Sequence, residues 1–151
     1  MLISNEWLKD YVDAGVAIED LAERITRTGI EVDDIIDYTK DIKNLVVGYI
    51  QSKEKHPNAD KLNICQVDIG EEEAVQIVCG APNVEAGQHV IVAKVGGRLP
   101  GDIKIKRAKL RGERSEGMIC SLQEIGISSN VVPKAYENGI FVFTEIGRAH
   151  V

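Results

Sequence analysis

Beyond residue 45, the chain consists of short runs of β-branched and other apolar residues, most of them followed by a cluster of Gly, Pro or Asn. The runs span residues 45–50, 62–69, 75–79, 90–95, 103–110 and 140–143. Such runs predict strands, and the clusters predict the turns between them. Five or six short strands within about 100 residues favour a small closed or partly closed barrel, with the OB-fold as the leading case.

Two of these runs change the parity of their apolar residues. In 62–69 the apolar side chains occupy even positions up to Ile64 and odd positions from Cys65, and a similar change separates Ile105 from Ala108. Successive side chains of a strand point to opposite faces, so each change predicts a β-bulge or a sharp bend, which small barrels use to close.

The first 38 residues instead predict two short helices followed by a strand. Apolar residues from Ile18 to Ile25 recur at helical spacing, and residues 30–38 predict the strand. These elements are too few to bury a core, so we expect the segment to pack on something else, either the body of this chain or a part not present in it. The predicted fold class is α+β, mainly β: a helix–helix–strand segment over 1–38 and a five-stranded OB-fold barrel over 39–145.

Composition excludes several classes of protein. The chain is 44% hydrophobic and 28% charged, as in ordinary globular domains, and no stretch approaches the roughly 18–20 apolar residues of a membrane span. Cys65, Cys79 and Cys120 are an odd number without a CxxC pair, so neither a disulfide framework nor a zinc site is predicted. We expect buried thiols in a reducing, cytoplasmic environment and no membrane partner.

Charge is distributed unevenly along the chain. Residues 1–38 carry three basic and ten acidic residues, a net charge of −7, whereas 39–151 carry a net charge of +1. Six cations within 11 residues form what we call the basic stripe: Lys104, Lys106, Arg107, Lys109, Arg111 and Arg114. Such a cluster suits phosphate groups. The same cations could serve only to keep an edge strand from aggregating, and composition does not separate the two interpretations.

Motifs for independent catalysis are absent from the sequence. The three histidines form no HxxxH or HExxH pair, and there is neither a Walker A sequence nor a G-x-S-x-G elbow. The glycine-rich stretch 96–101 lies between predicted strands, which indicates a hairpin loop rather than a phosphate-binding loop before a helix. We therefore predict neither catalytic residues nor metal ligands.

Three linked segments carry a family resemblance: HPNADKL at 56–62, QIVCGAPN at 76–83 and KLRGERSEGMICS at 109–121. Together they resemble the tRNA-binding OB-fold module found as a free protein, as an appendage of methionyl-tRNA synthetases and inside bacterial phenylalanyl-tRNA synthetase β subunits. Residues 1–11, with TGIEV at 28–32, are similar to the amino terminus of that β subunit in particular.

The resemblance implies an N-terminal fragment of a cytoplasmic subunit, because that β subunit is several times longer. Residues 146–151 do not match the family's continuation, and we expect them to be a truncation junction or an added tail. The parent enzyme is expected to attach phenylalanine to tRNA with ATP and magnesium, in an (αβ)2 assembly whose α subunit holds the synthetic site. The fragment itself is expected to bind tRNA, to need no cofactor and to catalyse nothing.

The predicted RNA-binding residues lie in the loop after the first barrel strand, in the basic stripe and just beyond it: His56, Asn58, Lys61, Lys104, Lys106, Arg107, Lys109, Arg111, Arg114, Ser115, Met118 and Ser121. Cations suit phosphates, hydroxyls suit phosphate or ribose oxygens, and methionine suits a base face. Structural alternatives stay open for Met118 as core filling and for the His56-Pro57-Asn58 turn as a rigid bend.

Two other functions stay open at this point. The barrel could be a scaffold that packs subunits together, or a general binder of single-stranded nucleic acid. Aromatic content disfavours the second, because residues 39–151 hold only Tyr49, Tyr136, Phe141 and Phe143 as stacking platforms. Recognition is therefore expected to rest on phosphates and shape rather than on bases.

Overall fold

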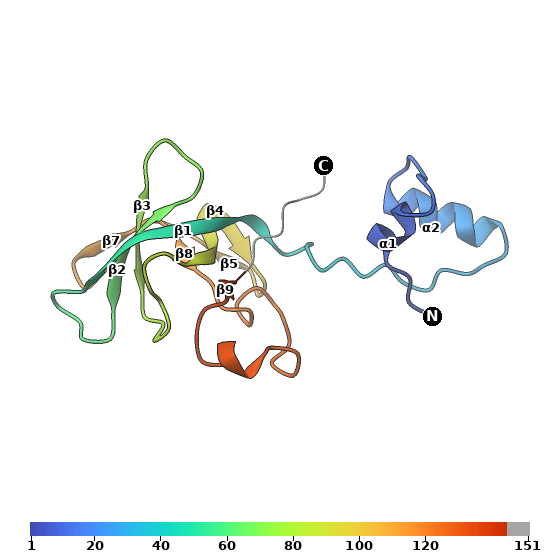
Figure 1. Ribbon diagram of the computed structural model, residues 1–151. Coiled ribbons are helices and arrows are strands. Elements are labelled where there is room, and N and C mark those ends of the chain that lie inside the picture. The colour runs from blue at the N-terminus through green and yellow to red at the C-terminus, as the bar shows by residue number, and fades with distance from the viewer. Residues whose placement is uncertain (145–151) are drawn as a thin grey trace. The chain divides into compact units, whose positions relative to one another are not determined.

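The computed structural model describes residues 1–144 (Figure 1). The chain divides into two units, Met1–Tyr38 and the part that begins at Thr39. The expected tail over residues 146–151 lies outside the described residues. No helix within the described part of the chain is long and apolar enough to cross a membrane.

The first unit contains two helices, α1 (Asn5–Lys9) and α2 (Ile18–Arg27). Ser4 caps α1, because its Oγ accepts a hydrogen bond from the amide of Trp7 at 3.3 Å. The strand predicted over 30–38 is wrong, because this stretch joins no sheet. A strand needs a neighbouring strand to satisfy its backbone hydrogen bonds, and the first unit contains no second strand.

The second unit is a curled antiparallel sheet built around four strands: β1 (Lys43–Lys55), β2 (Asn63–Asp68), β3 (Val75–Cys79) and β4 (His89–Leu99). Their order across the sheet is β3-β2-β1-β4. Alternate side chains point inward, and the larger core cluster includes the fully buried Ile50, Val67, Ile77 and Val92. A 3-10 turn at Lys134–Tyr136 and β9 (Val142–Phe143), which pairs with β4, follow near the end of the described chain.

Segment 113–120 connects the two sides of this sheet. It contains β7 (Glu113–Ser115) and β8 (Met118–Ile119). The amide of Glu116 donates to the carbonyl of Gln76 in β3 at 2.8 Å, and β8 pairs with β4. With this segment as the fifth strand, the prediction of a mainly-β, five-stranded OB-fold is confirmed.

The strand predicted over 103–110 is divided into two short strands. β5 (Ile103–Lys104) pairs with the end of β4, whereas β6 (Ala108–Leu110) pairs with β7 in a separate two-stranded sheet. Ile105 is buried between them, so the change of parity in the sequence marks a change of partner. The basic stripe therefore spans two different sheets.

The bend predicted in 62–69 arises in the neighbouring strand. The register between β1 and β2 shifts between Ile50 and Ser52 of β1, opposite Val67 and Gln66. Leu62 precedes β2, whose own residues alternate regularly. A bulge in one strand disturbs the pair as a whole, so parity indicated the bend but not the strand that carries the extra residue.

Candidate RNA-binding site

Loop 56–62, between β1 and β2, is fastened to the β6–β7 hairpin by two hydrogen bonds. The Nε2–H of His56 donates to the carbonyl of Leu110 at 2.8 Å, and the side-chain amide of Asn58 donates to the carbonyl of Arg111 at 3.5 Å. The backbone amide of Asn58 also donates to Nδ1 of His56 at 3.0 Å, which identifies Nδ1 as the unprotonated nitrogen. Two segments singled out in the sequence therefore meet.

The His56 ring is buried, with 4% of the residue exposed, and both of its nitrogens are occupied within the chain. A buried ring with no free nitrogen has nothing to offer an RNA phosphate. Of the two roles left open by the sequence, this geometry favours the structural one for His56.

Three cations of the basic stripe lie exposed on the hairpin. Lys109 and Arg114 are directly opposite each other in β6 and β7, and Arg111 lies in the turn. Arg111 and Gly112 both have positive φ, 51° and 96°, as a tight two-residue hairpin turn requires. Within residues 1–144 none of the three cations forms an ion pair, so their charge is available to a ligand.

Arg107 differs from these cations because a carboxylate lies beside it. Its Nε is 3.2 Å from Oε1 of Glu116; the side chain of Arg107 is 74% exposed and that of Glu116 25% exposed. Solvent around the arginine screens the pair and weakens it. A phosphate can therefore compete with Glu116 for Arg107.

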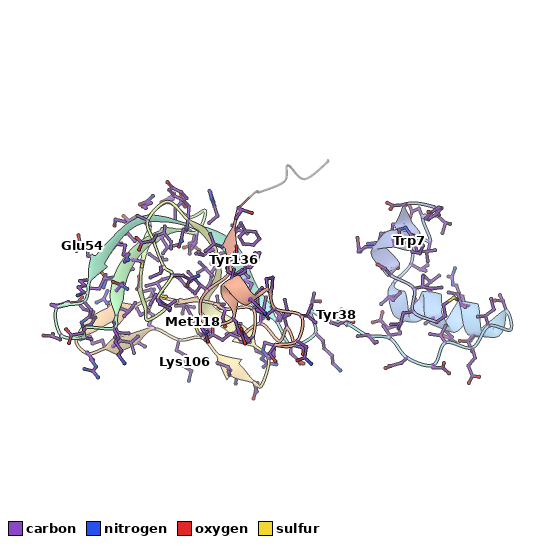
Figure 2. All side chains as sticks on the ribbon, turned by 60° about the horizontal axis from the view of Figure 1, so that its bottom comes forward. Trp7, Tyr38, Glu54, Lys106, Met118 and Tyr136 are labelled. Carbon is purple, nitrogen blue, oxygen red and sulfur yellow. The ribbon has the colours of Figure 1, made fainter. Side chains whose placement is uncertain are left out.

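Ser115 and Met118 are held within the barrel. The Oγ of the buried Ser115 accepts from the amide of Val78 and donates to the carbonyl of Gly117, both at 3.1 Å. Met118 packs against the smaller of the two core clusters, and Figure 2 shows it among the inner side chains, whereas Lys106 lies at the surface. Both contacts help to join segment 113–120 to the sheet, which favours structural roles for the serine and the methionine.

A groove of about 670 Å³ gathers five of the predicted residues: Lys104, Lys106, Ser115, Met118 and Ser121. Its wall also carries the carboxylates of Glu124 and Glu137. Glu124 Oε2 accepts hydrogen bonds from the amide of Ser121 at 2.7 Å and from its hydroxyl at 3.0 Å. This mixture of charges suits a polyanion less well than the exposed hairpin does.

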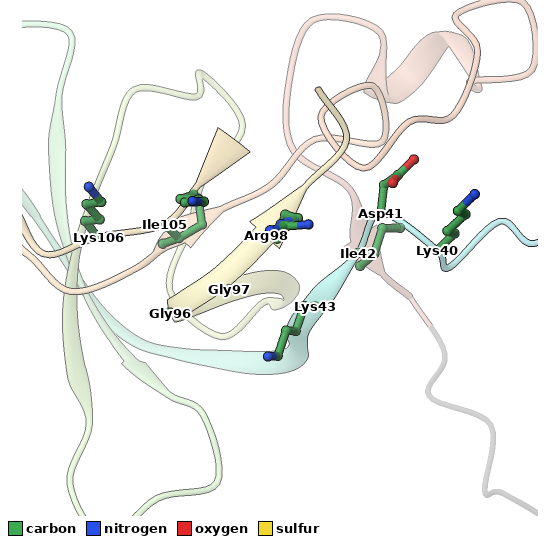
Figure 3. Close-up of a pocket in the computed structure, with 10 residues that line it drawn as sticks. Lys40, Asp41, Ile42, Lys43, Gly96, Gly97, Arg98, Ile105 and Lys106 are labelled. Atoms are coloured by element: carbon green, nitrogen blue, oxygen red, sulfur yellow. The ribbon is translucent and has the colours of Figure 1, made fainter. Parts of the chain in front are cut away.

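A second hollow, of about 460 Å³, is lined by cations that sequence reasoning left out of the site (Figure 3). Lys40, Lys43 and Arg98 line it together with Lys104 and Lys106 of the basic stripe, and we call it the basic hollow. Arg98 lies six residues before the first cation of the basic stripe, and this proximity was a signal for it. Nothing local pointed to the two lysines, which reach the stripe only because β1 pairs with β4.

These features define a class of protein. OB-type barrels bind oligonucleotides at the loops that follow their first and fourth strands. In this chain the first is loop 56–62, after β1, and the second follows β4 and contains the β6–β7 hairpin. The two are fastened together by hydrogen bonds. They carry exposed cations: Lys61, Lys109, Arg111 and Arg114. In the described part of the chain, no group of three or more His, Cys, Asp or Glu side chains could hold a metal ion. The second unit is a small barrel with the loop surface of a nucleic-acid-binding module.

A family model described as "Putative tRNA binding domain" matches residues 45–140. The chain therefore belongs to this family of tRNA-binding domains, and the resemblance seen in its sequence is confirmed.

The curated relatives are ligase subunits. The chain is 93% identical over 147 residues to the phenylalanine–tRNA ligase β subunit of Staphylococcus haemolyticus (strain JCSC1435), and 82% identical over 145 residues to that of Staphylococcus aureus (strain Mu50 / ATCC 700699). The matches cover 97% and 96% of this chain, which spans 18% of each relative's length. Among solved structures, the crystal structure of the C-terminal domain of Plasmodium vivax p43 matches with a TM-score of 0.43 and 28% sequence identity. The match covers 58% of this chain and 48% of the p43 chain.

Proposed function

We propose that this chain is the tRNA-binding part of a phenylalanine–tRNA ligase β subunit, and that its β6–β7 hairpin binds phosphates of tRNA. The observation that carries the proposal is the fastening of loop 56–62 to that hairpin, which presents exposed cations where OB-type barrels hold nucleic acids. Family membership and the identity to two ligase β subunits support tRNA as the ligand.

The twelve predicted residues take different roles in this proposal. Phosphate contacts come from the exposed cations: Lys61, Lys104, Lys106, Arg107, Lys109, Arg111 and Arg114. His56 and Asn58 hold the two loops together, and Ser115 and Met118 hold segment 113–120 in the barrel. Ser121 braces its own turn through Glu124.

Phosphates rather than bases are the expected targets, because each Tyr and Phe ring of the second unit's described residues contacts another ring. Tyr49 lies against His89, with ring centroids 4.9 Å apart. Phe141 lies edge-on between Tyr136 and Phe143, at 4.9 and 5.0 Å. Rings engaged in this way are poor platforms for unstacked bases, which disfavours a general single-strand binder.

For the whole enzyme, we propose that the parent protein attaches phenylalanine to tRNA with ATP and magnesium, in a cytoplasmic (αβ)2 assembly whose α subunit carries the reacting groups. This chain then supplies RNA contacts alone. Given phenylalanine, ATP, magnesium and tRNA, it should yield neither charged tRNA nor pyrophosphate exchange. Turnover that survives repurification of the chain would contradict this division of labour.

Titration of the 151-residue chain with tRNA, and with single-stranded DNA of equal length, at two salt concentrations tests the proposal. Each phosphate contact contributes roughly −0.7 (single strands) to −0.9 (duplex) to the slope of log K against log salt, so three or four contacts give about −2 to −4. We expect micromolar or weaker affinity for tRNA, because one small barrel makes few contacts. Equal affinity for the DNA would instead identify a general single-strand binder.

The informative variant replaces both paired hairpin cations, Lys109→Gln with Arg114→Gln. Both side chains are exposed, so the free energy of unfolding should stay within about 0.5 kcal/mol, while the slope flattens by about 1.5. A matched control, Lys94→Gln with Lys134→Gln, removes two charges outside the loops and should keep the wild-type slope. Unchanged tRNA binding with increased light scattering from the hairpin variant would identify a scaffold whose cations only prevent aggregation.

A further inference from the structure

The register of three strands places three cations in a row. Lys43 of β1 pairs with Arg98 of β4, and Arg98 pairs on its other side with Lys104 of β5. Residues directly opposite each other in a sheet share a face, so the three positive side chains are neighbours. Like charges in this arrangement destabilise a sheet. The row therefore costs some stability, and a bound anion would reduce that cost.

Interactions within the chain offset little of this repulsion. Arg98 Nε lies 3.6 Å from Oδ1 of Asp102, but the two side chains are 50% and 76% exposed, and so exposed a pair is weak. Lys43 and Lys104 form no ion pair in the part of the chain that the structure describes. Protection of a sheet edge would account for the two outer lysines, but not for the arginine between them.

The cation row lines the basic hollow, whose remaining walls also suit an anion. Lys40 and Lys106 add two further cations, and Asp41 is the one carboxylate among the described residues that line it (Figure 3). Two lining glycines leave the space between the cations free of side chains. A Cβ at Gly97 would lie 2.8 Å from the carbonyl oxygens of both Lys43 and Lys94, so the backbone packing there requires glycine.

The backbone beneath the cations is held in place by two hydrogen bonds. The amide of Gly96 donates to the carbonyl of Ile105, and the amide of Ile105 donates to the carbonyl of Gly97, each at 2.9 Å. These bonds tie the end of β4 to the chain that carries Lys104 and Lys106. The backbone of the hollow is therefore fixed, and an anion there would meet several cations carried by neighbouring segments of that backbone.

We infer that the basic hollow binds a phosphate group of the RNA backbone, as a second contact site separate from the hairpin. The inference rests on the proposed tRNA binding and adds Lys40, Lys43 and Arg98 to the RNA-contacting residues. Because residues 104–114 run from the hollow to the hairpin, one RNA strand can follow the chain between the two sites. A backbone phosphodiester carries one negative charge on two unesterified oxygens, so a single phosphate between two of these cations accepts charge-assisted hydrogen bonds from both and reduces their repulsion.

The first test compares the salt dependence of tRNA binding in the 151-residue chain and two variants. Lys43→Gln with Lys104→Gln removes the outer cations of the row, and the matched control is Lys94→Gln with Lys134→Gln. We expect the row variant to flatten the slope of log K against log salt by about 1.4 to 1.8, and the control to leave it unchanged. Its melting temperature should equal or exceed that of the wild type, because repulsion is removed. A row variant with the slope of the control would overturn the inference.

The second test separates this inference from the proposed function. Backbone amide resonances of Gly96, Gly97 and Ile105 are followed during titration with the ribotrinucleotide UpUpU, which carries phosphodiesters and no terminal phosphate. We expect saturable shifts that the row variant loses and the hairpin variant keeps. Shifts from UpUpU without any tRNA binding would refute the proposed function and leave the hollow as a phosphate site. Hairpin-dependent tRNA binding without such shifts would refute the hollow alone. Equal shifts from inorganic phosphate at equal concentration would assign a free anion and overturn the RNA source.

Discussion

The two units of this chain treat their apolar residues in opposite ways. Within Met1–Tyr38 no residue is buried, and Trp7 and Tyr11 are 60% and 75% exposed. In the second unit, Ile50 and Ile77 are fully buried. Regular apolar spacing is present in both units, so spacing alone does not produce a core. Burial requires a second layer, which a closed sheet provides for itself and two short helices do not.

The difference between the two units is tested most directly by producing each unit alone. We expect a peptide of residues 1–38 to be largely unfolded and to show no cooperative thermal transition in circular dichroism, because it has no core and a net charge of −7. A chain of residues 39–144 should unfold cooperatively. A sharp melting transition in the short peptide would show that the first unit is stable by itself.

Truncation of one isoleucine in each unit compares how much a buried and an exposed side chain contribute to stability. Ile77→Ala removes a fully buried side chain and should lower the free energy of unfolding by about 2–5 kcal/mol. Ile30→Ala removes a side chain that is 66% exposed and should change it by no more than about 0.5 kcal/mol. Urea unfolding of the 151-residue chain measures both. Equal effects would place Ile30 in a buried interface.

The hydrogen bonds of His56, which join the barrel loops, should contribute to stability but not to RNA contact. His56→Ala leaves the carbonyl of Leu110 and the amide of Asn58 without their partner, and should cost about 1–3 kcal/mol of stability. The salt slope of tRNA binding should be unchanged at a temperature where the variant is folded. Full stability combined with weakened tRNA binding would assign His56 to RNA contact instead.

The effect that is smallest at neutral pH is a pH dependence of stability that arises in the second unit, which holds all three cysteines. Burial raises the pKa of Cys65 to about 11 and that of Cys120 to about 12, from 9.0. The unfolded chain therefore loses these thiol protons first. The stability that these thiols contribute should be constant below pH 9 and be lost as pH rises towards 11 for Cys65 and 12 for Cys120, by about 1.4 kcal/mol per thiol and pH unit.

Urea midpoints measured at pH 8, 9 and 10 test this sign. The control is Cys65→Ala with Cys120→Ala, which should reduce the decline above pH 9. A stability that does not change between pH 8 and 10 would contradict the burial of these thiols in the folded barrel.

Much of the fold could be predicted from local patterns. The β-branched runs and their turn clusters indicated the barrel strands, and helical spacing indicated α2. The misplaced elements share one cause. Residues 30–38 have the composition of a strand but no partner, and 103–110 changes partner at the buried Ile105. The residue types of a segment indicate whether its backbone favours an extended conformation. A strand forms only where a second strand pairs with it through hydrogen bonds.

The candidate site likewise contains residues whose placement could be predicted from the sequence and residues whose placement could not. The exposure of Lys109, Arg111 and Arg114 followed from their density in the sequence, because charged residues in such number cannot all be buried. The burial of His56 could not be predicted, because its hydrogen-bond partners lie more than fifty positions away. Lys43 was missed for the same reason.

By itself, the sequence determined the strand and turn chemistry, the uneven charge and the three segments by which the family is identified. These properties depend on dihedral preferences and side-chain types of near neighbours, which act before any fold exists. Only the tertiary structure decided that Lys43, Arg98 and Lys104 lie side by side and that His56 forms a hydrogen bond with the hairpin. It also decided that the basic stripe is divided between two sheets. Register and closure bring together residues remote in the chain, and the energy of those contacts arises only when the barrel has formed.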